Sequence, residues 1–193
     1  MIPVSVQIEL CIMTASTKTH KTDKPPNPRP LEMRHDLHAV ADLIELCFSP
    51  TLDADGHRYI RQMRAAAKNP RAIGMVDRAA PGLHGFVWEE KDKIVGNLSL
   101  LPVVAERRRS YFIANVAVHP DYRRRGIARA LTEAAFEFIR KRGISSIWLQ
   151  VNEGNIGAIH LYQGFGFKER ACRTTWHSLP IAPRIGVFLS LQP

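Results

Sequence analysis

One stretch of this sequence, from Ile113 to Arg140, constrains the fold more than any other. A strand-like run (Ile113 to Val118) leads into a turn containing proline (His119 to Tyr122), and a basic loop with one glycine (Arg123 to Ala128) then opens into an amphipathic helix. The first backbone N–H groups of a helix lack intrahelical partners, and the helix dipole adds partial positive charge at that end. The stretch therefore predicts an anion cradle, and we expect a phosphate-bearing cofactor in it.

The size and composition of the chain fit one soluble domain with an added arm. The chain has 193 residues, of which 45% are hydrophobic and 23% are charged, as in a globular protein that buries a core. No stretch approaches the roughly 20 apolar residues of a membrane span. The start of the chain contains Gln7 and Glu9 and lacks a basic segment, so we predict neither a signal peptide nor a membrane partner.

The three cysteines, Cys11, Cys47 and Cys172, are widely spaced and form no CxxC pair. This number and spacing argue against a disulfide framework or a zinc site and favour structural thiols in a reducing, cytoplasmic compartment. We expect no metal cofactor.

The formal net charge of +9 favours phosphorylated or polyanionic partners. Arginines cluster at Arg107 to Arg109 and at Arg123 to Arg125. No interleaved aromatic platform accompanies them, so nucleic-acid binding is not favoured. A solvated basic face with one phosphate site explains the charge.

The first thirty residues form an appendage in this interpretation, and residues 31–193 form the domain. Apolar and polar residues alternate up to about residue 15, which predicts a strand. Residues 16–30 are polar, basic and rich in proline, which is typical of an extended linker.

Periodicity along the remaining chain predicts an α/β (α+β) domain. Asp36 is the expected cap of the first helix. The first two strands should form an antiparallel hairpin around Lys91 to Lys93, and the third should follow a basic turn at Arg107 to Arg109. The expected helices cover residues 37–48, 55–67, 127–143 and 155–163, and the expected strands cover residues 84–89, 94–103, 111–118, 146–151, 168–177 and 185–191.

Two segments of the chain resemble the GCN5-related N-acetyltransferases (GNAT family). VAVHPDYRRRGIARAL resembles their acetyl-CoA-binding core, in which Arg or Gln is followed after two residues by Gly and then, one residue further on, by Gly or Ala; these positions are Arg123, Gly126 and Ala128. LQVNEGNIGAIHLYQGFGF matches a second family segment. The resemblance spans about Leu31 to Leu191. It implies a mixed, mostly antiparallel sheet flanked by helices on both faces, with acetyl-CoA between two splayed strands and the acceptor entering from the opposite side.

The chemistry of the first motif agrees with that resemblance. Gly126 permits a sharp turn and a close backbone approach to a ligand. Ala128 keeps the first helical turn low, backbone amides from Arg124 to Arg129 can point at a diphosphate, and arginine side chains add charge. For the loop taken alone, an ordinary basic helix start is the alternative. The resemblance implies that the strand before the loop pairs with pantetheine, whereas a plain buried strand is the alternative there. The expected cofactor-binding residues are Val116, Ala117, Val118, Arg123, Arg124, Arg125, Gly126, Ile127, Ala128, Arg129 and Asn155.

Asn155 and Tyr162 belong to the second segment. The resemblance implies that Asn155 hydrogen-bonds the cofactor, and its residue type also suits a helix N-cap. Tyr162 lies seven positions later, on the same helical face. The resemblance implies that Tyr162 is the catalytic general acid for the departing CoA thiolate, and a phenol with a reference pKa near 10 is protonated at neutral pH. A half-buried core tyrosine is the alternative.

The general base is not evident from the sequence. Gln150 stands where relatives that acetylate a ribosomal-protein N-terminus have a glutamate, and a carboxamide is no carboxylate base, although it can orient water or substrate. Surface solvation is the simpler role for the remaining candidates, which are Glu153, Glu89, Glu90, His84 and His119. The absence of an evident base favours an acceptor amine of low pKa, such as an α-amino group, or proton loss through water.

The resemblance implies an acetyl-CoA-dependent N-acetyltransferase acting on a primary amine, either a small molecule or the α-amino group of a peptide or protein. The alternative is a non-catalytic acyl-CoA sensor or partner-binding module with the same fold, which Gln150 and the basic surface suggest. An RNA- or ribosome-associated protein is a third, weaker hypothesis. The sequence leaves the acceptor and the oligomeric state open, a homodimer included.

Overall fold

The computed structural model describes residues 28–49, 52, 54–69, 84–105, 107–172 and 187–191. Their strands form one seven-stranded sheet in the order β1-β2-β3-β4-β5-β7-β6. Neighbouring strands are antiparallel, except that β4 and β5 are parallel. The predicted mixed, mostly antiparallel sheet is therefore confirmed. The strands are β1 (Arg29–Pro30), β2 (His84–Glu90), β3 (Lys93–Ala105), β4 (Arg108–Val118), β5 (Ser146–Val151), β6 (Lys168–Cys172) and β7 (Val187–Leu191).

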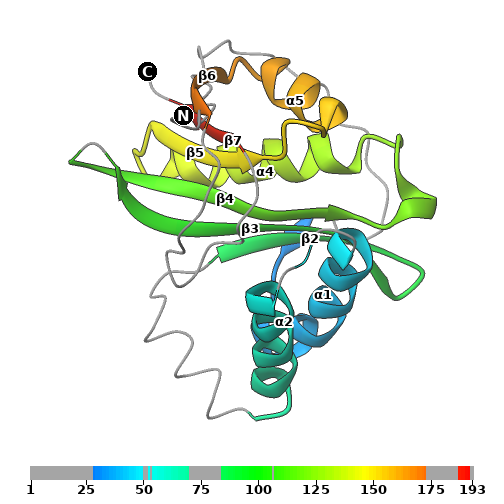
Figure 1. Ribbon diagram of the computed structural model, residues 1–193. Coiled ribbons are helices and arrows are strands. Elements are labelled where there is room, and N and C mark those ends of the chain that lie inside the picture. The colour runs from blue at the N-terminus through cyan, green and yellow to red at the C-terminus, as the bar shows by residue number, and fades with distance from the viewer. Residues whose placement is uncertain are drawn as a thin grey trace, which may run out of the picture.

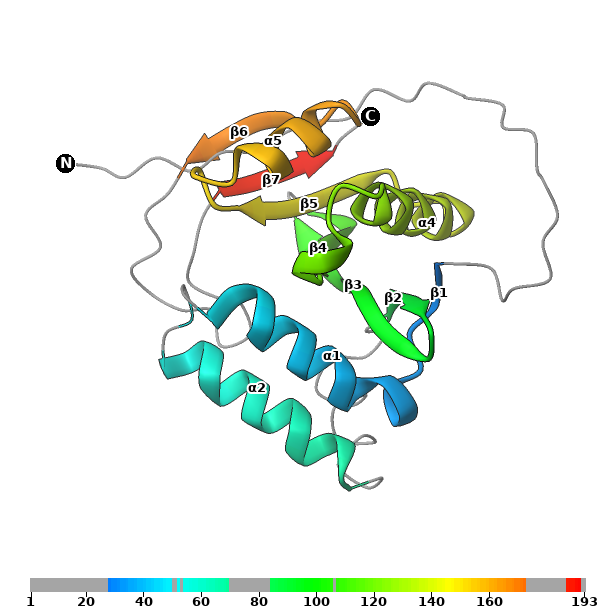
Figure 2. The ribbon, with the colours of Figure 1, turned by 90° about the vertical axis from the view of Figure 1, so that its right-hand side faces the viewer.

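Helices cover both faces of the sheet, as predicted. The pair α1 (Met33–Phe48) and α2 (Ala54–Ala67) lies on one face, and α4 (Ile127–Lys141) and α5 (Ile156–Gln163) lie on the other (Figures 1 and 2). None of the helices within the described ranges is long and apolar enough to cross a membrane.

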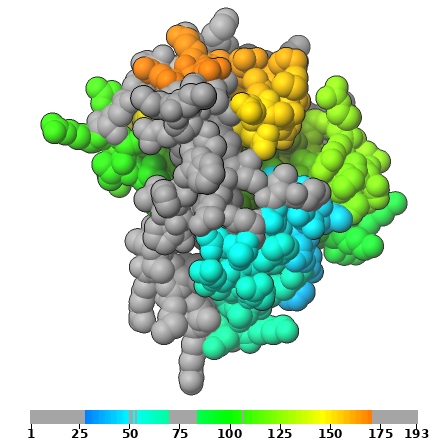
Figure 3. All heavy atoms as spheres, viewed as in Figure 1, coloured from blue at the N-terminus to red at the C-terminus, as the bar shows by residue number. Residues whose placement is uncertain are grey.

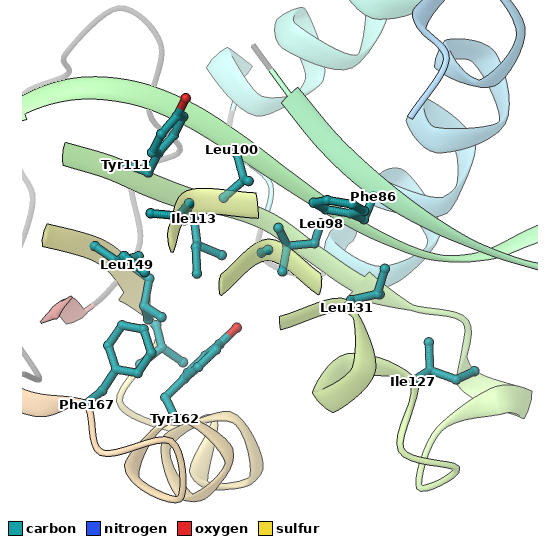
Figure 4. Packing of buried hydrophobic residues seen from close by; sticks show 14 of the residues in the cluster. Phe86, Leu98, Leu100, Tyr111, Ile113, Ile127, Leu131, Leu149, Tyr162 and Phe167 are labelled. Atoms are coloured by element: carbon teal, nitrogen blue, oxygen red, sulfur yellow. The ribbon is translucent and has the colours of Figure 1, made fainter. Parts of the chain in front are cut away.

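Each face has its own hydrophobic core. The core under α1 and α2 includes Val40, Ile44, Ile60 and Val87. The larger core under α4 and α5 includes Leu98, Leu100, Ile113, Leu131, Ile139, Leu149, Tyr162 and Phe167, most of which Figure 4 shows.

The start of α1 differs from the prediction, because Asp36 is not its cap. The helix begins at Met33 with Glu32 as N-cap, and Asp36 lies inside the first turn. There its carboxylate accepts a hydrogen bond from the Glu32 backbone N–H (2.7 Å) and two from the Arg29 guanidinium (2.7 and 2.9 Å). Arg29 also pairs with Glu89 at 2.7 Å. Asp36 thus binds the N-cap amide of α1 and, through Arg29, also anchors β1.

Arg29 and Pro30, which the composition assigns to the linker, form β1 and pair with Val87 and Phe86. The strand predicted up to about residue 15 and the linker residues 16–27 lie outside the described residues.

The predicted antiparallel hairpin of β2 and β3 is confirmed, and the strand after it begins earlier than predicted. Lys91 and Asp92 both have positive φ (50° and 59°), as a type I′ turn requires, and they join β2 to β3. β4 begins earlier than predicted, since Arg108 and Arg109 already pair with β3 instead of forming a turn. The last two predicted strands cover residues 168–177 and 185–191. The parts of them that the structure describes are β6 and β7.

Candidate functional site

The parallel strands β4 and β5 separate halfway along their length. They pair only where Ser110–Ile113 faces Ser146–Leu149. Beyond these residues β4 continues beside β3 to Val118, and β5 continues beside β7 to Val151. The facing edges of the two strands therefore carry backbone groups without a strand partner among the described residues. An extended ligand can add to such an edge as a strand would. This is the gap between splayed strands that the sequence analysis predicts.

A β-bulge at Asn115 shapes the β4 edge of this gap. Asn115 has a φ of +51°, and the register between β3 and β4 shifts between Asn97 and Ser99. The Asn97 Nδ2 group donates a hydrogen bond to the Asn115 carbonyl at 2.8 Å. The Asn115 side chain in turn contacts the Tyr59 hydroxyl of α2 at 3.1 Å. The bulge is thus held both from the sheet and from a helix.

The bulge changes which face of the sheet the β4 side chains after it point to. Ile113 belongs to the core under α4, and Val116 and Val118 also pack against that core. In a regular strand, residues three apart would point to opposite faces. Ala117 pairs with Asn97 and lies on the α1/α2 face. The Val118 carbonyl accepts hydrogen bonds from Arg123 Nε (3.1 Å) and Cys47 Sγ (3.3 Å).

The loop after β4 makes a tight turn into α4. A 3₁₀ turn, η2 (Pro120–Tyr122), comes first, and Arg124 (φ +63°) and Gly126 (φ +78°) then adopt left-handed conformations. Gly126 is the N-cap of α4 and offers no side chain to cap it. The first N–H groups of α4 are therefore available to a ligand, beside an exposed segment from Arg123 to Gly126.

Three of the predicted arginines are held against neighbouring groups. Arg123 donates a hydrogen bond to the Val118 carbonyl. Arg125 donates one to the Asp121 carbonyl at 3.2 Å, and its guanidinium carbon lies 4.9 Å from the centre of the Tyr122 ring. Arg129 lies 4.9 Å from the centre of the Phe165 ring, which follows α5. Figure 3 shows the loop, α5 and α1 reaching the same side of the molecule.

Ile127 and Ala128, also predicted to bind the cofactor, lie at the start of α4. The Ile127 side chain is buried in the core, so this residue can offer a ligand only its backbone. Ala128 is half-buried, and its carbonyl accepts a hydrogen bond from the Thr132 hydroxyl at 2.8 Å.

Asn155 is the N-cap of α5, as its residue type predicts. Its side-chain oxygen accepts a hydrogen bond from the Ala158 N–H at 3.1 Å. Within the described part of the chain its side-chain NH₂ has no partner, so that group can still donate to a ligand. The capping and ligand-binding roles of Asn155 are geometrically compatible.

Tyr162 is more deeply buried than the predicted alternative of a half-buried residue. Its side chain lies beside Phe167, with ring centres 5.5 Å apart, and burial raises the pKa of its phenol. Figure 4 shows the hydroxyl directed away from α5, towards the strands. No hydrogen bond joins this hydroxyl to a described residue. Tyr162 therefore holds a proton at neutral pH and has a hydroxyl that can donate it.

Two of the five candidate bases, Glu89 and His84, lie away from the gap, whereas His119 and Glu153 follow the ends of β4 and β5. Gln150 lies on β5 at the edge of the gap, and its Nε2 atom is buried and has no partner among the described residues. Glu89 on β2 is paired with Arg29, and His84 on β2 packs edge-on against Phe138 at 4.6 Å. Because β3 separates β2 from β4, these two side chains start from a strand that does not border the gap. Within the described ranges, no three His, Cys, Asp or Glu side chains cluster as metal ligands.

The comparison with known families decides the family. The model of the Acetyltransferase (GNAT) family matches residues 37–167, more than half of the chain. The chain belongs to the GNAT acetyltransferase family.

Individual relatives agree with this assignment. The [ribosomal protein bS18]-alanine N-acetyltransferase of Escherichia coli K12 is 43% identical over 63 residues, which are 33% of this chain and 43% of that protein. The match therefore spans less than half of this relative. The crystal structure of the E. coli ribosomal-protein-S18-alanine N-acetyltransferase has a TM-score of 0.61 at 22% identity, with 84% of this chain and 90% of that chain covered. The PaiA N-acetyltransferase of Thermoplasma acidophilum, solved in complex with coenzyme A, has a TM-score of 0.54 at 16% identity, with 75% and 96% covered.

Sequence reasoning missed the polar residues that hold the bulge, namely Asn97, Asn115 and Tyr59. A signal for two of them was present, because asparagines interrupt the apolar runs IVGNLSLL and IANVAV. Asparagine is rare inside strands and tolerates positive φ, so it marks an irregular strand.

Proposed function

We propose that this protein is an acetyl-CoA-dependent N-acetyltransferase that moves the acetyl group to a primary amine. The observation that supports this most strongly is the β4–β5 gap, which ends at a left-handed Gly126 and an uncapped helix N-terminus. A gap edge with free backbone groups fits an extended amide-bearing arm, and free N–H groups fit a diphosphate. The residues that would hold them are Val116 and Val118 for the arm and residues 126–129 for the diphosphate.

The reaction proposed is direct attack of a neutral amine nitrogen on the thioester carbonyl carbon. A C–N bond forms, the C–S bond breaks, and the sulfur leaves with the bonding electron pair. The phenol of Tyr162 supplies the proton for the sulfur, and water takes the proton that the attacking nitrogen loses. The raised pKa of Tyr162 keeps that proton in place until negative charge develops on the sulfur.

We further propose that the acceptor is an α-amino group. At neutral pH an amine with a pKa near 8 is neutral far more often than a lysine side chain with a pKa near 10.4. Such an amine needs less help from a base, which matches Gln150 in place of a carboxylate. The name of the bS18-alanine N-acetyltransferase supports the same class of acceptor.

The test is to incubate the full chain with acetyl-CoA and a panel of amines. The panel contains a peptide with a free N-terminus, an N-terminally blocked lysine peptide and a polyamine. Free thiol and acetylated product should appear together, fastest with the free N-terminus. Tight CoA binding without thiol release for any amine would instead support the sensor alternative.

A further inference from the structure

A patch of uncharged polar side chains lies at the mouth of the gap, on the sheet face opposite Tyr162. Ser99 on β3 pairs with Ala114 on β4, which follows the last residue that pairs with β5. Gln150 follows the corresponding last residue of β5. Ser99, Ala114 and Gln150 therefore form a row across three strands, and the strands diverge between Ala114 and Gln150. We call Asn97, Ser99, Asn115 and Gln150 the polar patch.

The register places the patch on the α1/α2 face. Asn97 pairs with Val87, which belongs to the core under α1 and α2. Gln150 lies between Leu149 and Val151, which both belong to the core under α4 and α5, so its side chain points the other way. Tyr162 belongs to that second core. A nucleophile at the patch and an acid at Tyr162 would therefore approach the gap from opposite faces of the sheet.

Two atoms of the patch lack hydrogen-bond partners among the described residues. The Asn97 side chain is fully buried, and its Nδ2 group is committed to the Asn115 carbonyl, which fixes the orientation of the carboxamide. Its Oδ1 atom, which can only accept, is left unpaired. The buried Nε2 atom of Gln150, which can only donate, is unpaired too. Buried polar atoms without partners are costly and rare, so they point to a ligand that supplies one donor and one acceptor.

We propose that the polar patch binds the N-terminal residue of a peptide acceptor. The Oδ1 atom of Asn97 accepts a hydrogen bond from the α-amine, and Nε2 of Gln150 donates one to a nearby peptide carbonyl oxygen. A lysine side chain has only methylene groups beside its amine and cannot satisfy Gln150. No member of the patch carries a formal charge, so the patch favours an amine that arrives neutral. This inference rests on the proposed N-acetyltransferase function and identifies the residues that select its acceptor.

The test compares a tripeptide amide that has a free N-terminus with n-butylamine, which has an amine but no carbonyl. Steady-state kinetics are measured for the wild type, Gln150→Met and Asn97→Ala, and calorimetry measures tripeptide binding to the CoA-loaded protein. Gln150→Met preserves side-chain length and removes the donor. Gln62→Met, at an exposed position on α2, is the matched control.

Gln150→Met should raise the KM and the Kd of the tripeptide about tenfold, the effect of losing one hydrogen bond, and leave n-butylamine kinetics and CoA affinity unchanged. Asn97→Ala should raise the KM of both amines, with circular dichroism as the check on folding. Equal effects of Gln150→Met on the two amines, or no effect on tripeptide KM and Kd, would overturn the proposal. If the wild type turned over no amine, the proposed function would fail, and the calorimetric comparison would still decide whether the patch binds the peptide.

Discussion

Gly96 in β3 packs closely against the side chain of Ile127, the first residue of α4. A Cβ atom at Gly96 would lie 2.7 Å from Cγ2 of Ile127 and 3.2 Å from Cδ1 of Leu131. The missing side chain lets the N-terminus of α4 sit close to the sheet. Because the loop from Arg123 to Gly126 ends at that N-terminus, Gly96 helps to set the height of the loop over the gap.

Gly96→Ala should therefore weaken acetyl-CoA binding without touching the ligand. Overpacking of this contact should lower the free energy of unfolding by about 1–3 kcal/mol and lift the start of α4. Denaturant unfolding and calorimetry with acetyl-CoA measure the two effects. Gly157→Ala is the comparison, since its Cβ would have nothing nearer than 3.9 Å and alanine favours a helix. Unchanged stability and CoA affinity in Gly96→Ala would contradict this description of the contact.

Gly126→Ala should separate backbone strain from ligand binding. Gly126 and Gly143 both have positive φ (78° and 66°), and a Cβ atom added to either residue would have no neighbour within 4 Å. Alanine at either site should cost about 1–2 kcal/mol of stability through the left-handed conformation alone. Only Gly126→Ala should reduce acetyl-CoA affinity, because only Gly126 begins α4. Equal CoA affinities for the two variants would argue against a diphosphate site at residues 126–129.

Tyr162→Phe should lower kcat about a hundredfold or more and leave the KM for acetyl-CoA nearly unchanged, as loss of a general acid predicts. Tyr111→Phe, which removes another buried phenol of the same core, is the control.

The pH profile gives a second readout of Tyr162. Burial raises its pKa above the ordinary value of 10.0, so the phenol stays protonated at pH 10. The rate should rise as the acceptor amine loses its proton and show no decline up to about pH 10. A decline well below that pH, absent in Tyr162→Phe, would show that the phenol ionises early.

His84 should make the protein less stable as the pH falls. Burial and the nearby Arg142 lower the pKa of His84, so the folded state resists its protonation. Below about pH 6.5 the unfolded chain binds this proton more readily than the folded chain does, and the unfolding free energy decreases. Urea unfolding at pH 7.5 and pH 5 should show a smaller decrease for His84→Phe than for the wild type. Arg142→Gln should also reduce the decrease, and an identical pH response in all three proteins would exclude this role.

Much of the fold could be predicted because local patterns and tertiary structure agree. The 3.6-residue period from Ile127 onwards and the turn at Lys91 and Asp92 each specify their element within a few residues of sequence. The cap of α1 was misplaced because Asp36 has the residue type of an N-cap. Its actual position depends on Arg29, which approaches it from β1, and no local pattern shows that pairing.

The geometry around Gly126 could likewise be predicted in outline, since the glycine and arginine spacing marks a basic loop that opens into a helix. The acceptor side could not. Its residues come together through the register of β3, β4 and β5, which brings Asn97 and Gln150 to the same face. A sequence does not show which buried amide atoms are left without partners.

Hydrogen–deuterium exchange with and without acetyl-CoA tests the central claim most directly. The account predicts that acetyl-CoA slows exchange at the amides of Val116 and Val118 and of residues 126–129. The amides of Ser110–Ile113, already paired within the sheet, should not change. Saturating acetyl-CoA that leaves the exchange of residues 116–118 and 126–129 unaltered would contradict the assignment of the β4–β5 gap as the acyl-cofactor site.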